Sequence, residues 1–247
     1  MSADGEASRP PASAGRGAPR AFDGVEHWIF DLDNTLYPAH CRLFAQIDRR
    51  MADFIAQRLG VDEPEARRVQ KDYYARYGTT LAGLMLEYAV APHDFMAYVH
   101  DIDVSVVPPN PELAARIDAL PGRKYVFTNG SVAHAENVAR RVGVAHCFDD
   151  VFDIAAADWT PKPQAATYAK FVERCGVAPA RAAMFEDLAR NLEAPAALGM
   201  TTVLVQCDAA WFADEPAGRR PARPGDPQPD HVHHATEDLA AFLGDIA

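Results

Sequence analysis

Short apolar runs recur along the chain at intervals that suit a sheet wound with helices. Five of them are rich in β-branched or aromatic residues and are bounded by turn signals, as buried strands are: VEHWIF, KYVFTNG, DVFDIA, AAMFED and TTVLVQ. Two stretches between them have helical character, one running from a Ser131 cap to Gly143 and the other ending at Gly176. Alternating strands and helices predict an α/β fold, a doubly wound, Rossmann-like parallel sheet with helices on both faces.

The pattern becomes purely helical between about Cys41 and Asp103. The first stretch there stops at Gly60, and its apolar residues fall on one helical face: Leu43, Ile47, Met51, Phe54 and Ile55. The second opens on Asp62 and Glu65 in capping-box spacing, and two further helical segments follow, TTLAGLMLEYAV and PHDFMAYVHDID. We therefore expect an all-helical unit inserted directly after the first strand.

These patterns divide the chain into three expected parts. Residues 1–21, rich in Ala, Pro, Gly, Ser and Arg, are expected to form a disordered tail. Residues 22–38 and 106–247 are expected to form the α/β core, and residues 39–105 a helical cap. Within the core, the proline-rich stretch of residues 214–230 is expected to be an exposed loop.

Composition and charge narrow the functional classes. The 247 residues are 49% apolar and 24% charged, as in an ordinary globular protein, and the net charge of −11 argues against binding to a nucleic-acid backbone. No apolar run approaches the roughly 18 residues that a membrane span needs, and the first twenty residues lack the apolar segment of a signal peptide. Four scattered cysteines without a CxxC pair suit a reducing compartment, so a cytoplasmic location is expected. The oligomeric state stays open.

Polar side chains stand where the predicted strands end. They are Asp31 and Asp33, the turn Thr128-Asn129-Gly130, Lys162 between two prolines, and the adjacent pair Glu186 and Asp187. Ligands of doubly wound sheets bind outside the carboxyl ends of the strands, so we expect these groups to meet there. The period of two in a strand sends the Asp31 and Asp33 side chains the same way, and two like charges repel unless a cation or a shared proton lies between them.

Together these groups form a coherent chemical set. Carboxylate oxygens with open positions suit Mg²⁺, which keeps several waters and is often completed by a substrate phosphate. Lys162 adds a compact positive charge for phosphoryl oxygens, and Thr128 and Asn129 at a helix start can hold an anion. An aspartate can then attack phosphorus, while a neighbouring acid protonates the leaving alkoxide and later deprotonates water.

In this order, the motifs DLDNT, TNG, PKP and ED resemble those of the haloacid dehalogenase superfamily. The likeness spans the chain from about residue 25 to 206. It implies that Asp31 is the nucleophile and Asp33 the general acid and base. It further implies that the transferring phosphoryl group is bound by Thr128, Asn129 and Lys162.

The same resemblance implies a metal site and a cap. Mg²⁺ would be ligated by Asp31, the backbone carbonyl of Asp33 and Asp187, with Glu186 acting through a water or from just outside the ligand set. The helical insert is similar to the cap of the subgroup that includes phosphoglycolate phosphatase and β-phosphoglucomutase. A cap of this kind is expected to close over the site.

One level finer, FDLDNTLYP together with YYARYGTTLAGL resembles the pyrimidine 5′-nucleotidase branch. Asn34 and the Tyr37-Pro38 pair carry this likeness, since many sugar-phosphate enzymes of the subgroup have DGTL or DGVL where this chain has DNTL. The likeness implies a small phosphorylated metabolite as partner, with a pyrimidine nucleoside 5′-monophosphate preferred.

Several readings stay open beside this one. Displacement of halide needs no proton, and by resemblance the dehalogenases lack an acid two residues after the nucleophile, so Asp33 favours phosphate ester hydrolysis. A phosphatase of another small metabolite (phosphoglycolate or a sugar phosphate), a mutase and a catalytically silent binding protein are the alternatives. Asn191 is a candidate for orienting the metal site, whereas the histidines of DHVHH are expected to be structural.

Overall fold

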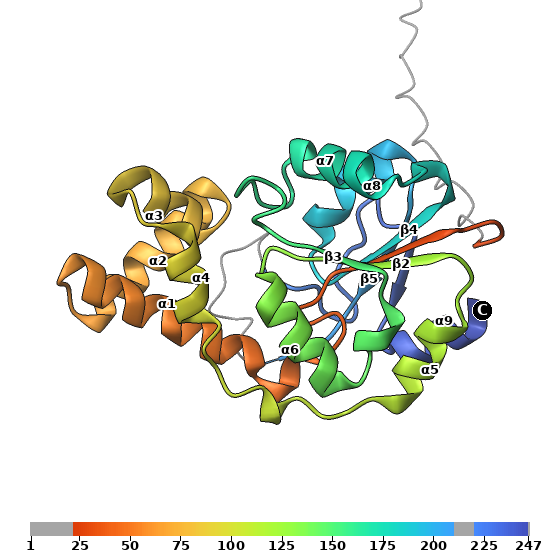
Figure 1. The fold of residues 1–247 in the computed structure, drawn as a ribbon, viewed down its shortest axis with the longest axis horizontal. Coiled ribbons are helices and arrows are strands. Elements are labelled where there is room, and N and C mark those ends of the chain that lie inside the picture. Colours follow the sequence, from red (N-terminus) through yellow and green to blue (C-terminus); the bar gives the residue numbers. More distant parts are fainter. Residues whose placement is uncertain (1–21, 210–219, 247) are drawn as a thin grey trace, which may run out of the picture.

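The computed structural model describes residues 22–209 and 220–246, and a parallel sheet forms their centre (Figure 1). The six strands of this sheet lie in the order β3-β2-β1-β4-β5-β6. They are β1 (His27–Phe30), β2 (Arg123–Phe127), β3 (Asp150–Phe152), β4 (Ala182–Glu186), β5 (Thr201–Val205) and β6 (His234–Thr236). All neighbouring strands pair in parallel. The predicted doubly wound parallel sheet is confirmed.

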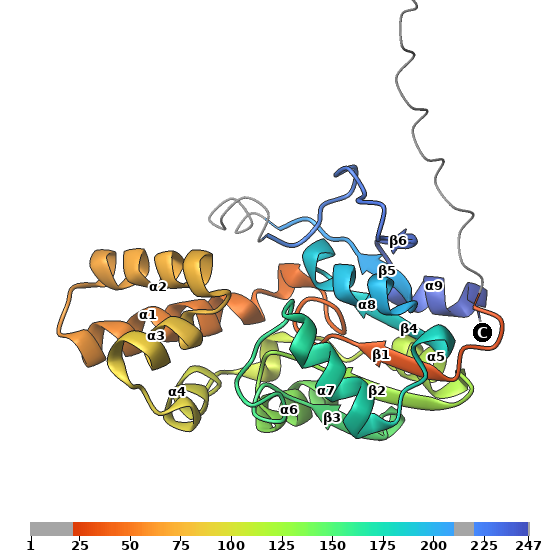
Figure 2. The ribbon, with the colours of Figure 1, turned by 90° about the horizontal axis from the view of Figure 1, so that it is seen from above.

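Helices cover both faces of the sheet, which makes three layers (Figures 1 and 2). One face carries α5 (Pro111–Ala119), α6 (Val132–Val142) and α9 (Leu239–Ile246). The opposite face carries α7 (Ala165–Cys175) and α8 (Glu193–Leu198). Short 3₁₀ helices lie in the connections: Ala39–Cys41, Val104–Val106, Ala145–Cys147, Pro179–Arg181 and Ala189–Leu192.

Alternate residues of each strand serve the two layers, which explains the short, continuously apolar runs. In β1, Trp28 and Phe30 belong to the core cluster under α5, α6 and α9, whereas Ile29 belongs to the cluster under α7. Phe30 stacks on Phe185 of β4 with the ring centroids 4.6 Å apart. Because both faces are covered, the central residues of β1 and β4 are apolar on both faces.

Four of the helices between β1 and β2 form a unit where the periodicity predicted helices. They are α1 (Leu43–Leu59), α2 (Glu63–Tyr77), α3 (Thr80–Tyr88) and α4 (Pro92–Val99). They have a hydrophobic core of their own and lie to one side of the sheet (Figures 1 and 2). Asp62 caps α2 by accepting the Glu65 N–H, but the Glu65 carboxylate binds Arg68, so only half of the expected capping box forms.

The proline-rich stretch is less exposed than expected. Residues 214–219 lie outside the described residues, as does the expected tail of residues 1–21. In the described remainder, Pro221 and Ala222 are buried. The Ala222 N–H donates to the Asp187 carbonyl oxygen at 3.0 Å, and the Ala222 carbonyl oxygen accepts from the Cys207 N–H at 3.1 Å. Those two backbone hydrogen bonds draw this part of the stretch inward, so the expectation of an exposed loop was wrong there.

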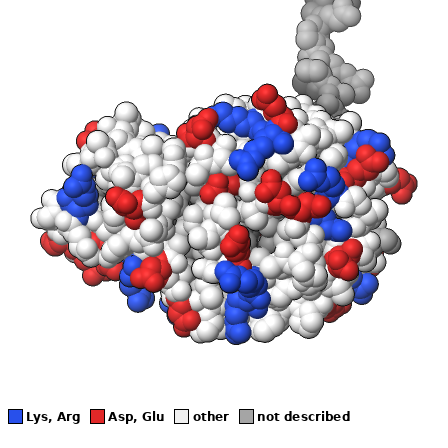
Figure 3. All heavy atoms as spheres, viewed as in Figure 1, with Lys and Arg blue, Asp and Glu red and all other residues white. Residues whose placement is uncertain are grey.

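The surface and the helices bear on the classes of partner. Acidic and basic side chains are interspersed over the described residues on the face drawn in Figure 3, rather than gathered by sign. No helix within residues 22–209 and 220–246 is both long and apolar enough to cross a membrane. The four cysteines are free thiols.

Candidate active site

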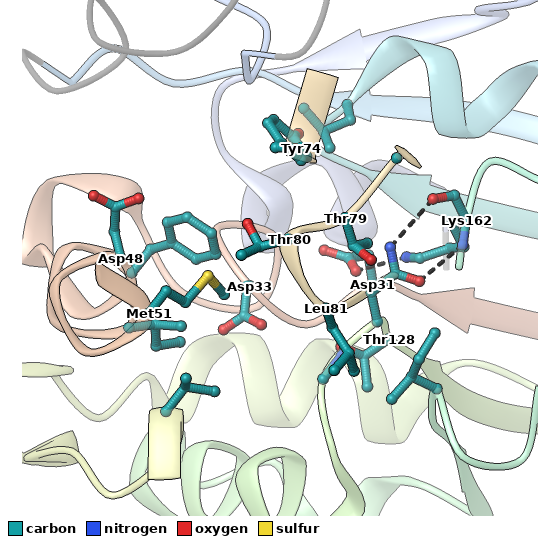
Figure 4. Close-up of a pocket in the computed structure, with 18 of the residues that line it drawn as sticks. Asp31, Asp33, Asp48, Met51, Tyr74, Thr79, Thr80, Leu81, Thr128 and Lys162 are labelled. Atoms are coloured by element: carbon teal, nitrogen blue, oxygen red, sulfur yellow. Dashed lines mark hydrogen bonds and ion pairs between the residues drawn. The ribbon is translucent and has the colours of Figure 1, made fainter. Parts of the chain in front are cut away.

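A cavity of about 180 Å³ lies between the helical unit and the carboxyl ends of the strands (Figure 4). All the site residues predicted from the sequence line it: Asp31, Asp33, Thr128, Asn129, Lys162, Glu186 and Asp187. The helical unit contributes apolar and polar side chains to the other half, among them Phe44, Asp48, Met51, Gln70, Thr80 and Leu81. The fold therefore joins groups that lie up to 156 positions apart in the chain, from Asp31 to Asp187.

The strand register explains why these residues meet. In β1, Phe30 is level with Val126 of β2 and Phe185 of β4, so the chain leaves the sheet at nearly the same level in all three strands. The Asp31 N–H still donates to the Phe185 carbonyl oxygen at 2.9 Å, which fixes the Asp31 backbone as it leaves the sheet. Strand ends in a parallel sheet thus bring side chains distant in sequence to one edge.

Lys162 is the centre of the buried charges. Its Nζ donates to Asp31 Oδ1 at 2.7 Å, to Glu186 Oε1 at 2.7 Å and to the Phe127 carbonyl oxygen at 2.9 Å. The lysine is 1% exposed, so all three donors of its ammonium group are used inside the protein. Thr35 Oγ1 donates to the other oxygen of Asp31 at 3.0 Å. The nucleophile predicted from the sequence is held from both sides.

Burial sets the pKa values of this cluster in opposite directions. Burial alone would lower the pKa of Lys162, but the carboxylates of Asp31 and Glu186 outweigh it and raise that pKa. Burial raises the pKa of Asp31 to about 7, against the opposing effect of Lys162. Burial and the neighbouring carboxylates of Glu186 and Asp31 raise the pKa of Asp187 well above its ordinary value. One lysine does not compensate three buried carboxylates.

That excess of negative charge fits a divalent cation. Asp31, Glu186 and Asp187 are buried and offer carboxylate oxygens within 4.8 Å of one another. Two amide oxygens nearby, those of Asn34 and Asn191, are buried without a hydrogen-bond partner in the described part of the chain. Hard oxygen donors of this kind suit Mg²⁺. The donor set therefore fits the ion that the sequence analysis expected.

The three carboxylates differ in how many hydrogen bonds each already accepts. Glu186 Oε1 accepts from Lys162 and, at 2.6 Å, from Asn191 Nδ2, while its Oε2 accepts from the Leu188 N–H at 2.9 Å. Asp187 Oδ2 accepts one longer hydrogen bond, from Asn34 Nδ2 at 3.3 Å. Asp187 therefore has the most capacity left for an ion, Asp31 accepts one bond on each oxygen, and Glu186, which accepts three, has the least.

The turn after β2 binds the lysine as well as lining the cavity. Thr128 Oγ1 accepts the Gly130 N–H at 2.9 Å. The Asn129 amide is paired with the Lys162 backbone, since its Oδ1 accepts the Lys162 N–H at 2.8 Å and its Nδ2 donates to the Lys162 carbonyl at 3.3 Å. This pairing fixes the segment that carries Lys162. The contact of Asn129 with a phosphoryl group stays a prediction.

Asp33 has partners quite separate from those of Asp31. Its Oδ1 accepts from Tyr37 Oη at 2.6 Å and from His134 Nε2 at 2.8 Å. Burial alone would raise the pKa of Asp33, but His134 and Tyr37 outweigh it and lower that pKa. In Figure 4 the Asp33 carboxylate lies apart from the cluster around Lys162. The two acids, separated by one residue, thus rely on different partners, and the charge of Asp33 adds to the causes that raise the pKa of Asp31.

Sequence reasoning did not find several of these partners. Thr35, Tyr37 and His134 received no role at the site, and Asn191 was left open. Thr35 and Tyr37 bind carboxylates four residues earlier, a spacing that a tight turn after a strand could have indicated. His134 lies 101 positions from Asp33, and no local pattern indicates that contact. The DHVHH histidines have structural contacts, as expected: His231 bonds the Ala189 carbonyl and His233 bonds the Thr202 N–H.

Comparison with known proteins settles the family. The model of the haloacid dehalogenase-like hydrolase family matches residues 25–199, more than half of the chain. The chain therefore belongs to the haloacid dehalogenase-like hydrolase family, and the resemblance drawn from the motifs is confirmed. The cavity and its buried charged side chains are therefore those of a member of this family.

Individual relatives are more distant. Phosphate metabolism protein 8 of Saccharomyces cerevisiae is 28% identical over 136 residues, which are 50% of this chain and only 42% of that protein. Enolase-phosphatase E1 of Bradyrhizobium sp. is 31% identical over 187 residues, 66% of this chain and 76% of that one. The structure of a HAD phosphatase from Thermococcus onnurineus superposes with a TM-score of 0.60 at 16% identity, over 90% of this chain and 98% of that chain, and so shows the shared fold alone.

Proposed function

We propose that this protein is a Mg²⁺-dependent phosphomonoester hydrolase that acts through an aspartyl-phosphate on Asp31. One observation carries the proposal: Asp31 beside Lys162, and Asp33 held by its own two donors, line the same cavity. Ester hydrolysis needs this pair, because the nucleophile attacks phosphorus while a separate acid protonates the alkoxide. The word phosphatase in the name of the Bradyrhizobium relative supports the same reaction class.

The reaction has two steps. In the first, a carboxylate oxygen of Asp31 attacks phosphorus, the ester P–O bond breaks, and the leaving alkoxide takes a proton from Asp33. In the second, water attacks the phosphorus of the aspartyl-phosphate while Asp33 takes a proton from it, and inorganic phosphate leaves with Asp31 restored. We assign Thr128 and Asn129 to the phosphoryl oxygens, which they help to hold in line with Asp31. Lys162 belongs to the same phosphate site as a neighbouring positive charge, because its three donors already bond Asp31, Glu186 and the Phe127 carbonyl.

We assign the metal site to Asp31, Asp187 and the backbone carbonyl of Asp33, with Glu186 acting through a water or from just outside the ligand set. Glu186 already accepts three hydrogen bonds, against two at Asp31 and one at Asp187, which supports its separate role. When bound, Mg²⁺ supplies positive charge for the phosphoryl oxygens as the reaction proceeds. Before that, the Asp31 and Asp187 side chains need only lose protons, since both already line the cavity.

We further propose residues 39–105 as the cap over this site and a pyrimidine nucleoside 5′-monophosphate as the preferred substrate. The DNTLYP segment supports the nucleotide, and so does the make-up of the helical half of the cavity. Phe44, Met51 and Leu81 offer apolar contact for a planar base. Gln70, 2% exposed and with its Oε1 unpaired among the described residues, offers an acceptor for a polar edge. A cytoplasmic location suits the free thiols.

A phosphate-release screen with Mg²⁺ tests the proposal. The panel contains uridine, cytidine and adenosine 5′-monophosphates, phosphoglycolate, a hexose phosphate and p-nitrophenyl phosphate. We expect turnover of phosphomonoesters in general and the highest kcat/KM for the two pyrimidine nucleotides. If no ester in the panel releases phosphate, the proposed hydrolase activity is refuted. A preference for phosphoglycolate or the hexose phosphate would refute only the proposed nucleotide preference.

A further inference from the structure

We propose that Tyr37 and His134 are positioning residues that hold Asp33 by one carboxylate oxygen, so that the proton moves on the other. We also propose that His100 connects this pair to the helical unit. The inference rests on the proposed function and deepens it, because it says how the acid and base is held during both steps.

The geometry is a clamp on a single oxygen. Tyr37 Oη and His134 Nε2 both contact Asp33 Oδ1, at 2.6 and 2.8 Å. Both side chains are themselves rigidly packed, with Tyr37 3% and His134 1% exposed. No residue in the described ranges, 22–209 and 220–246, bonds Asp33 Oδ2. The Asp33 side chain is 17% exposed and lines the cavity, so one oxygen is fixed and the other is free to face substrate.

Such a clamp works in both protonation states of the acid. A carboxylate accepts hydrogen bonds on Oδ1, and a carboxylic acid protonated on Oδ2 still accepts them on Oδ1, which is then its carbonyl oxygen. A proton on Oδ1 would instead compete with Tyr37 and His134 for the same lone pairs. The proton given to the alkoxide, and later taken from water, therefore travels on Oδ2 without breaking either hydrogen bond.

The state of the His134 ring fits this role. A carboxylate has no proton to give, so Nε2 must carry one and donate it. The other ring nitrogen, Nδ1, is buried without a partner among the described residues. Nε2 carries this proton whether the ring is neutral or charged. Nε2 is thus a lasting donor to Asp33.

His100 links the clamp to the helical unit. It directly follows α4, and its Nδ1 lies 2.9 Å from Ser131 Oγ, the cap of α6. Its ring stacks on the His134 ring with centroids 4.3 Å apart and planes 10° apart. A Cβ at Gly130 would come within 3.2 Å of the His134 ring, so the core side of this stack is also tightly packed. Movement of α4 is therefore transmitted to the donor on Asp33.

The test compares two esters that differ in their need for an acid. The alkoxide of a nucleotide or another alkyl phosphate needs a proton to leave, whereas p-nitrophenolate is a stable anion and leaves without one. The parameter is kcat/KM, which covers the steps up to departure of the leaving group. The key variant is Tyr37→Phe, which keeps the ring and removes one donor. We expect kcat/KM to fall about tenfold or more for the alkyl ester and to stay within about twofold for p-nitrophenyl phosphate.

Histidine variants separate hydrogen bonding from packing. His134→Phe keeps a ring under His100 and removes the donor, while His134→Gln keeps a donor, so Gln should recover much of the alkyl-ester activity that Phe loses. His100→Ala should give the same ester-dependent loss in smaller degree. Tyr125→Phe is the matched control: it removes a buried hydroxyl that bonds the Cys175 carbonyl on the other face of the sheet, and should affect neither ester.

The outcomes separate the clamp from the proposed function. An equal loss of kcat/KM for both esters, or no loss for the alkyl ester, would overturn the clamp. If His134→Phe fails to fold, the result for Tyr37→Phe alone decides the question. If the wild-type protein cleaves neither ester, the proposed function fails, and ¹⁵N-histidine NMR then tests the clamp alone. We expect His134 to carry its proton on Nε2, with its signal identified from the spectrum of His134→Gln. A proton on Nδ1 only would overturn the clamp.

Discussion

The two halves of the cavity are built on different principles. In the core half, Asp31, Lys162 and Glu186 are between 1% and 6% exposed, and hydrogen bonds hold each charged group. In the helical half, side chains such as Met51 and Leu81 make the wall chiefly by packing, and they come from helices with a separate hydrophobic core. Charge and hydrogen bonding fix geometry, whereas apolar packing adapts to shape. We therefore expect the core half to govern the chemistry and the helical half to govern which ester fits.

The largest expected effect follows from removal of the nucleophile in the core half of the cavity. Asp31→Asn should lower phosphate release from every ester by about a thousandfold or more, because an amide cannot form the aspartyl-phosphate. Folding should be intact, since Asn has the size and shape of Asp and burial already favours the neutral form of this side chain. Rates are measured by phosphate release and folding by circular dichroism. Asp118→Asn, the same change at an exposed residue of α5, serves as the control; wild-type-like turnover by Asp31→Asn would refute the mechanism.

The next largest effect concerns stability. Lys162→Met should lower the free energy of unfolding by about 3–5 kcal/mol, because it leaves buried carboxylates without their cation. Urea unfolding followed by circular dichroism measures the change, and added Mg²⁺ should recover part of it. Lys170→Met is the matched control: it breaks a more exposed pair with Asp158 and should cost less than about 1 kcal/mol. Equal costs for the two variants would mean that the buried cluster gains nothing from Lys162.

A third prediction concerns pH and the metal. Burial raises the pKa of Asp31 to about 7, so below that pH the metal-free protein carries a proton that Mg²⁺ must displace. The dissociation constant for Mg²⁺ should therefore rise by about tenfold or more for each unit of pH below 7, because Asp31 contributes one displaced proton and Asp187, whose pKa burial also raises, adds to the displacement. Isothermal titration calorimetry at several pH values measures this. Affinity that is independent of pH between 5 and 8 would contradict the assignment of Asp31 as a ligand, as would full activity in a chelator.

The smallest effect should come from the helical half. Met51→Ala removes part of the wall and so enlarges the cavity at a half-buried position. We expect KM for the nucleotide to rise about threefold to tenfold, with little change in kcat for p-nitrophenyl phosphate. Met85→Ala makes the same change in the same helical unit, at a residue that does not line the cavity. A large fall in kcat with both esters for Met51→Ala would show that the helical half also governs the chemistry.

Local pattern was enough for much of the fold. Strands such as β1 and β4 lie buried on both sides, so their runs are apolar throughout and stand out against the polar turns that follow. The helices of the insert were recognisable by their apolar face and by stops such as Gly60. The burial of Pro221 and Ala222 was missed because backbone hydrogen bonds to Asp187 and Cys207 leave no mark in composition.

For the candidate site too, local sequence predicted the reactive residues, whereas their contacts depend on the fold. Local sequence was enough to find the reactive groups at the strand ends, because a polar residue that closes a buried apolar run is a local feature: Asp31, Thr128 and Glu186 are of this kind. Only the tertiary structure decided how they pair. Lys162 reaches Asp31 across 131 positions and His134 reaches Asp33 across 101. Such contacts depend on strand order and on helix packing, which set distances that no local spacing records.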